Sequence, residues 1–315
     1  MFQSVTQDAA NVYFTLADGT LITIAKGDNT NYLYTITYMP NGGEGDVVID
    51  TVFYGESYSI RWCLVYTKEG YYIGSWNTNP DGHGTHFYLG RTINAVSRNI
   101  TLYAQWRAYD GIENGYYYVD LGLPSGLKWA ACNVGATAPE AYGNYYAWGE
   151  IEPKTTYDYD WSTYKWCDGS NTTLTKYCTK ESNGKDGFTD GKTVLDPEDD
   201  AARANWGGAW RMPTFDECEE LVNNCTWTWT DDYNGTGVAG GILKSNTNGS
   251  HIFLPAAGRG NLVGAGDCGY YLSSSLKTDR PDYAWNVHFY WDSDDVGRGF
   301  SYRVYGLSVR PVLGE

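Results

Sequence analysis

The last hundred-odd residues of this 315-residue chain contain only one segment with the pattern of a regular helix, the best helix pattern in the chain, and this limits the fold more than any other feature. Residues 215–224 place Leu221 and Val222 on an apolar side, with acidic residues facing outward. They follow Thr214, a residue type that caps helix N-termini. Elsewhere, short runs of Tyr, Trp, Val and Ile alternate with turns, and the chain holds 38 Gly, 29 Tyr and 13 Trp. Because aromatic and β-branched residues favour strands, the sequence predicts a β-rich α+β protein with few helices and long loops.

Composition excludes several classes of partner. Hydrophobic residues make up 42% and charged residues 19%, which is typical of a folded chain. The 38 acidic and 22 basic residues give a formal charge of −16, which repels nucleic-acid phosphates and anionic bilayers. No apolar run approaches the length of a bilayer span, and the first residues lack the pattern of a signal peptide. We therefore expect no nucleic-acid partner and no direct membrane insertion by this chain.

The cysteines do not have the spacing of a metal site. None forms a Cys-x-x-Cys pair or lies at zinc-ligand spacing from a histidine. Cys218 and Cys225 are seven residues apart, which on a continuous helix separates them by about 10 Å, too far for a disulfide. We expect buried free thiols and at most a disulfide such as Cys167–Cys178. The seven cysteines are Cys63, Cys132, Cys167, Cys178, Cys218, Cys225 and Cys268.

Residues 1–30 contain two alternating runs, 12–16 and 21–24, on either side of Asp18-Gly19. An Asp-Gly turn between two alternating runs predicts a β-hairpin. Two strands alone are only marginally stable, so we expect the hairpin to pack on another segment or to end an upstream stalk.

Residues 31–107 form a module with its own order of motifs. These are Tyr-x-Ile-x-Tyr at 34–38, Asn-Gly-Gly at 41–43, Tyr-Gly-Glu-Ser-Tyr at 54–58 and Thr-Leu-Tyr-Ala-Gln-Trp at 101–106. Their order resembles the Listeria–Bacteroides repeat over the whole module. The resemblance implies a small β-grasp-like spacer of bacterial surface proteins, present here in one copy.

Residues 108–315 form the large domain, with short strands expected at 252–255, 269–272, 284–289 and 308–312. Its motifs are Val-Asp-Leu-Gly at 119–122, Lys-Trp-Ala at 128–130, Ala-Trp-Gly-Glu at 147–150, Trp-Arg-Met-Pro-Thr at 210–214 and Ser-Val-Arg-Pro-Val at 308–312. This set resembles the major paralogous domain of Fibrobacter and Bacteroides secreted proteins. The resemblance implies the C-type-lectin-like fold shared with formylglycine-generating enzymes and the variable proteins of diversity-generating retroelements. We expect Trp206, Trp210 and Arg211 to serve the packing of this domain.

Catalytic motifs are weak in this domain. A formylglycine-generating enzyme needs a reactive cysteine pair near the C-terminal strands, where Cys268 stands alone. Glycoside hydrolysis needs two carboxylates, but among 38 acidic residues any pair can be nominated. We therefore expect no enzyme activity and no cofactor. Calcium binding remains an alternative, because a run of acidic side chains offers clustered oxygen ligands: Asp196, Glu198, Asp199 and Asp200. Asp-Pro followed by acidic residues is also typical of a helix start, which is the structure we expect there.

The last strands carry the main functional hypothesis. Residues 279–312 contain no Lys, Glu, Gln or Met. In retroelement variable proteins, mutagenesis of asparagine codons at adenines cannot reach these four types, so the resemblance implies a diversified surface. Chance and ordinary loop composition account for the same absence, so both explanations stay open.

These observations together predict a secreted or cell-surface protein that binds a protein or glycan on another cell, phage or host surface. Rigid aromatic side chains would supply apolar area, and polar ones would fix orientation. The alternatives are a polysaccharide-processing enzyme and a structural or fimbrial surface component. The candidate ligand-binding residues are Tyr271, Leu272, Tyr283, Asn286, His288, Tyr290, Asp292, Arg298, Phe300, Tyr302 and Val304.

Overall fold

The chain folds into two compact units, seen in a computed structural model. One unit comprises Met1–Ile60 and Ser75–Gln105, and the other comprises Arg61–Gly74 and Trp106–Glu315. Among the described residues, no helix is long and apolar enough to cross a membrane. The structure describes residues 2–7, 11–16, 18, 20–25, 32–61, 66–87, 91–154, 159–233, 236–292 and 296–314. Gly19, Cys63 and residues 293–295, which bear on the predictions above, lie outside these ranges.

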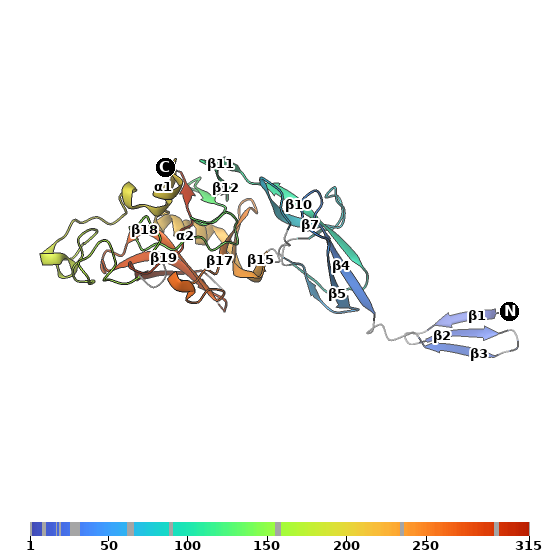
Figure 1. The fold of residues 1–315 in the computed structure, drawn as a ribbon. Helices are drawn as coiled ribbons and strands as arrows, with labels where there is room; N and C mark the ends of the chain where they lie inside the picture. The colour runs from blue at the N-terminus through green and yellow to red at the C-terminus, as the bar shows by residue number, and fades with distance from the viewer. Residues whose placement is uncertain are drawn as a thin grey trace. The chain divides into compact units, whose positions relative to one another are not determined.

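The predicted N-terminal hairpin is confirmed. Strand β2 (Asn11–Leu16) pairs antiparallel with β3 (Leu21–Ala25), with Phe14 opposite Ile22. A third strand, β1 (Phe2–Gln7), pairs with the other edge of β2, and the three strands form a separate small sheet (Figure 1).

The repeat-like module is built on a five-stranded sheet. Alternation along β4 is confirmed, because Ile36 and Tyr38 are fully buried and their neighbours are not. The Tyr38 ring meets Trp76 edge to face at 4.8 Å between centroids. The short strands β6 (Tyr58–Ser59) and β9 (Thr92–Ile93) pair separately. The strand order of the large sheet is β5 (Val48–Phe53), β4 (Leu33–Met39), β10 (Ile100–Ala108), β7 (Tyr71–Asn77) and β8 (His86–Phe87), with β10 parallel to β4.

The second unit contains three further sheets and little helix, as the composition predicts. The first sheet has the order β11 (Gly111–Glu113), β12 (Tyr116–Asp120), β13 (Lys128–Ala130), β21 (Val312–Leu313) and β14 (Trp210–Arg211). The second is β15 (Cys225–Tyr233), β16 (Val238–Ser245) and β17 (His251–Pro255). The third, called here the C-terminal sheet, is β18 (Cys268–Leu276), β19 (Tyr283–Tyr290) and β20 (Gly297–Tyr302), with β20 at its edge.

The predicted strand at 308–312 is wrong in extent. Only Val312–Leu313 joins a sheet as a strand, because Pro311 has no N–H to donate to a ladder. The Ser308 N–H instead donates to the carbonyl of Tyr270 at 3.1 Å. This segment therefore crosses between sheets.

The helix predicted at 215–224 is confirmed as α2 (Phe215–Asn224). Thr214 accepts from the Glu217 N–H, and the Glu217 carboxylate accepts from the Thr214 N–H, which completes a capping box. Helix α2 packs against β18 and β19 (Figure 1). The helix start expected in the Asp-Pro run is also present, because Asp200 caps the short helix α1 (Ala201–Trp206) by accepting from Arg203 N–H.

The C-terminal sheet has hydrophobic core on both of its faces. Leu272 and Ala284 belong to one buried cluster, which includes Trp148, Trp206 and Trp210. Tyr271, Val287 and Phe289 belong to the other, together with Cys218 and Leu221 of α2. Trp206 and Trp210 thus serve the packing, as expected. Arg211 forms an ion pair with Glu217 at 2.6 Å.

Two buried arginines join the loops of this unit. The Arg310 guanidinium donates to Asn133 Oδ1 and to the carbonyls of Ala130, Ala131 and Phe253, at 2.8–3.1 Å. Arg303 is also fully buried, and it donates to the Tyr164 hydroxyl and to three carbonyls. Because each guanidinium nitrogen has an acceptor, these arginines connect strands and loops that lie far apart in the sequence.

The candidate disulfide between Cys167 and Cys178 does not form, and both residues are free thiols. Each thiol instead donates to a nearby carbonyl, Cys167 to Trp161 and Cys178 to Lys180, both at 3.1 Å. Burial raises the pKa of both thiols, so they stay protonated and unreactive at neutral pH.

Candidate functional site

The structure divides the eleven candidate residues by exposure. Tyr290 and Phe300 are 38% and 46% exposed, and Asp292 and Arg298 are exposed as well. Three more are partly buried: Tyr283, His288 and Tyr302. The remaining four are at most 3% exposed: Tyr271, Leu272, Asn286 and Val304.

The exposure expected for those four residues is wrong. The Tyr271 hydroxyl donates to the carbonyl of Pro255 at 2.7 Å, inside the cluster beneath α2. Leu272 faces the other core cluster, and Asn286 donates to the Ser301 hydroxyl at 2.9 Å. Val304 packs into a third cluster, with Ala147 and Tyr164. These side chains position the sheet and do not reach a ligand at its surface.

The exposed candidates lie on two faces of the C-terminal sheet. On one face Trp285 stands opposite Phe300, and Tyr283 stands opposite Tyr302. The Tyr283 and Tyr302 rings stack at 4.2 Å, and the first residue of α2, Phe215, stacks on Trp285 at 4.5 Å. These five aromatic residues are called the Trp285 group.

A smaller set, the Tyr270 group, lies on the opposite face and consists of Tyr270, His288 and Tyr290. The Tyr270 ring stacks on His288 at 5.7 Å, and the two tyrosine hydroxyls share a hydrogen bond of 2.5 Å. Gly297 and Gly299 leave the space that His288 occupies, because a Cβ at either position would come within 2.7 Å of the imidazole. Burial lowers the pKa of His288, so the imidazole is neutral at pH 7.

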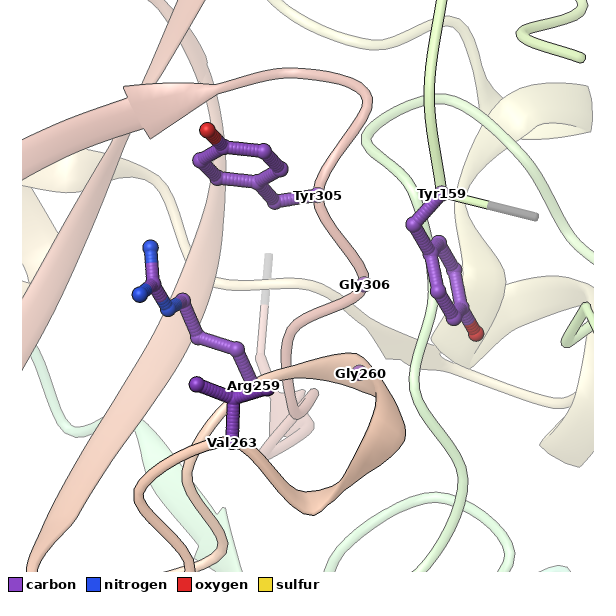
Figure 2. Close-up of a pocket in the computed structure, with 6 residues that line it drawn as sticks. All are labelled: Tyr159, Arg259, Gly260, Val263, Tyr305 and Gly306. Atoms are coloured by element: carbon purple, nitrogen blue, oxygen red, sulfur yellow. The ribbon is translucent and has the colours of Figure 1, made fainter. Parts of the chain in front are cut away.

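A pocket of about 220 Å³ is lined by residues that contact these two groups. Tyr305 lines the pocket and contacts Tyr302 of the Trp285 group, at 5.7 Å between ring centroids. Arg259 also lines it and lies over the ring of Tyr270, at 5.6 Å. Figure 2 shows the Arg259 guanidinium extending beside the Tyr305 ring, with Tyr159 on the other side of the Gly306 backbone. One residue of the pocket lining therefore contacts each of the two aromatic groups.

Glycines shape the walls of this pocket. A Cβ on Gly260 or Gly306 would come within 2.6 Å of the Tyr159 ring, so only glycine allows the ring to pack there. The Gly260 N–H donates to the Gly306 carbonyl at 2.7 Å, which ties the two pocket loops together. The Tyr159 hydroxyl donates to the Tyr145 carbonyl at 2.6 Å, and burial raises the pKa of Tyr159 to about 12. Tyr159 is therefore a fixed, neutral wall.

Arg259 differs from the other cations beside these aromatic groups. Lys277 lies over Trp285 but pairs with Asp279 at 2.6 Å, and Arg280 lies over Tyr283 but pairs with Asp282 at 3.3 Å. Arg259 is held by the Tyr270 ring and by the Tyr305 ring at 5.3 Å. Within the described part of the chain, its side chain has no carboxylate at ion-pair distance and donates no hydrogen bond. As far as the described residues go, the guanidinium N–H groups of Arg259 are therefore available to a ligand.

The acidic run at 196–200, weighed above as a calcium site, is bound to lysines. Lys176 pairs with Asp196 at 2.7 Å and with the buried Asp199 at 2.6 Å, and Asp199 also accepts from the Tyr177 hydroxyl. These lysine contacts lower the pKa of Asp196 to about 2. Across the residues that the structure describes, no three His, Cys, Asp or Glu side chains gather as metal ligands.

Comparison with known proteins gives one result. Residues 34–105 match the Listeria-Bacteroides repeat domain. The resemblance of the small module is confirmed over that range, and the match carries no specific function. Neither the curated proteins nor the solved structures include a match to this chain.

Sequence reasoning missed the pocket residues Arg259, Tyr159 and Tyr305. The Gly-Arg-Gly run at 258–260 was the available signal, because glycines on both sides of a single charge are typical of a close approach by other groups. Nothing in the sequence around Tyr159 indicated that its ring would lie against residues a hundred positions away.

Proposed function

We propose that residues 108–315 form the ligand-binding head of a secreted or cell-surface protein. The ligand, a protein or a glycan, would contact the pocket at Arg259 together with exposed members of the Tyr270 group or the Trp285 group. No catalytic step and no cofactor belong to this proposal. The observation that carries it is a pocket in which Arg259 pairs with no described carboxylate and whose lining residues contact both aromatic groups.

Rigid aromatic rings supply contact area with little loss of conformational entropy, which is why they dominate binding hot spots. Phe300 and Tyr290 each expose more than a third of their surface, although both belong to ring networks that hold them in place. The repeat domain at 34–105 occurs in surface proteins and supports the location.

We further propose that the head has a C-type-lectin-like fold and that its last strands vary as in retroelement variable proteins. The motifs shared with the major paralogous domain and the residue types missing from 279–312 support this. Under this proposal the varied positions are the exposed ones, such as Tyr290 and Phe300, and exclude buried ones such as Leu272. A reverse-transcriptase gene beside a near-copy of the last coding segment would support it, and intact flanking DNA without one would count against it.

The binding test uses the full chain on glycan and protein arrays, followed by titration of the ligand found. Tyr290→Ala and Phe300→Ala are tested separately, because they lie on opposite faces of the sheet. We expect at least one of them to weaken binding about tenfold or more, as hot-spot truncations do. Ile112→Ala is the matched control, since Ile112 is 57% exposed in the same unit but far along the sequence from these groups.

Unchanged affinity in both variants would show that the proposed surface does not bind the ligand. Release of reducing ends from a polysaccharide incubated with the pure chain would instead favour the alternative, a polysaccharide-processing enzyme. That alternative has no specific carboxylate pair to support it.

A further inference from the structure

We infer that the pocket at Arg259 binds the carboxylate of an acidic sugar, such as a hexuronate unit of a glycan. This rests on the proposed function and names the ligand class for the same site.

Among the described residues, none accepts a hydrogen bond from the guanidinium of Arg259. The guanidinium lies over the Tyr270 ring at 5.6 Å and over the Tyr305 ring at 5.3 Å, and these cation–π contacts hold it at the pocket. A planar guanidinium in this state presents a fork of donors that matches a carboxylate with two parallel hydrogen bonds. Lys277 and Arg280 lack this property, because Asp279 and Asp282 already pair with them.

The rest of the pocket suits one ring. Its volume of about 220 Å³ is smaller than the pockets that hold drug-sized ligands, which begin at about 300 Å³. Tyr159 and Tyr305 provide apolar walls and Val263 adds an aliphatic rim that is 55% exposed. Such walls pack against the C–H faces of a sugar ring while the arginine binds its acid group.

A peptide fits this place less well. Peptides that bind in extended form need unpaired main-chain donors and acceptors. Here the Arg259 N–H donates to the Val263 carbonyl at 3.0 Å, and the Gly260 N–H donates to the Gly306 carbonyl at 2.7 Å. The main chain beside the pocket is already paired within the protein.

The net charge of −16 does not oppose this site at close range. At physiological ionic strength, charges farther away than about 8 Å are largely screened. The carboxylate would contact the guanidinium directly, so the nearest charge decides its binding.

The test is a cycle of two ligands and two proteins, measured by ligand-observed NMR titration of the full chain. The ligands are galacturonate and galactose, which differ at the acid group, and the proteins are the native chain and Arg259→Gln. We expect the native chain to bind galacturonate about ten to a hundred times more tightly than galactose, as a charge-assisted hydrogen-bonded pair predicts. Arg259→Gln should bind both sugars equally.

Two further variants separate direct contact from a structural role. Arg280→Gln, the matched change at a paired arginine on a tyrosine ring, should keep the preference for galacturonate. Arg259→Lys keeps the charge without the fork and should retain part of the preference, which covers the case in which Arg259→Gln folds poorly. A general loss of structure would weaken the binding of both sugars to the same extent.

Equal binding of the two sugars by the native chain, or no binding of either, would overturn this inference. So would binding of an acetylated dipeptide with a free carboxylate as tightly as galacturonate, because that result assigns the pocket to peptide ends. In each case, weaker binding of an array ligand by Tyr290→Ala or Phe300→Ala would still support the proposed function. Failure of the acidic-sugar inference can therefore be told apart from failure of the proposed function.

Discussion

Arginine is used in opposite ways in two regions of the second unit. In the interior, Arg310 donates to one side chain and three carbonyls, and it connects residues 130–133 with Phe253. At the pocket, Arg259 lies between two tyrosine rings and donates to no described residue. The N–H groups of Arg310 therefore stabilise the fold. Those of Arg259 can donate to a ligand, and this difference distinguishes the scaffold from the proposed binding surface.

The largest expected effect comes from the interior arginine. Arg310→Met removes a donor from the carbonyls of Ala130, Ala131 and Phe253, and each unsatisfied buried acceptor costs about 1–3 kcal/mol. We expect the free energy of unfolding to fall by at least about 3 kcal/mol, measured by urea titration of tryptophan fluorescence. Arg259→Gln should cost about 1 kcal/mol or less, because it loses only the cation–π contacts of a partly buried side chain. Equal losses in the two variants would contradict the comparison.

Two of the four histidines, His251 and His288, differ in how strongly they should make stability depend on pH. Burial lowers the pKa of His251 to about 4, whereas its unfolded value is about 6.5. The unfolded chain therefore binds more protons between these values, and stability falls as pH falls from about 7 to about 4. The expected loss is about 3 kcal/mol. His288 is only partly buried, and burial lowers its pKa in the same direction.

We expect His251→Phe to flatten the pH dependence of unfolding more than His288→Phe does, measured by thermal unfolding from pH 4 to pH 7. His83→Gln, a change at an exposed residue, is the control. A steeper pH dependence in His251→Phe than in the native chain would be the contrary result.

Much of the scaffold could be predicted because local rules decide it. Thr214 with Glu217 specifies the start of α2, and alternating residues on either side of the Asp-Gly turn specify the hairpin β2–β3. Alternation failed in the C-terminal sheet, since core clusters cover parts of both of its faces. Tyr271 and Leu272 are neighbours that point in opposite directions, and both are buried. A period of two cannot say which face meets solvent in such a sheet.

The candidate site could be predicted only in part for a related reason. Tyr290 directly follows the strand predicted at 284–289, and it is exposed. Phe300 was also a candidate and is exposed, but it lies on β20, a strand that was not predicted. Arg259 comes from a loop, and its pairing state depends on rings at 270 and 305 that meet it only in the folded chain. Long-range contacts of this kind leave no local pattern.

Amide hydrogen exchange of the full chain, with and without the ligand found on the arrays, tests the division between scaffold and binding surface most directly. We predict slower exchange on binding in peptides that span residues 258–272 and 283–292, and no change in peptides that span 128–134 and 210–214. Slower exchange confined to the scaffold peptides, or to residues 34–105, would contradict the account.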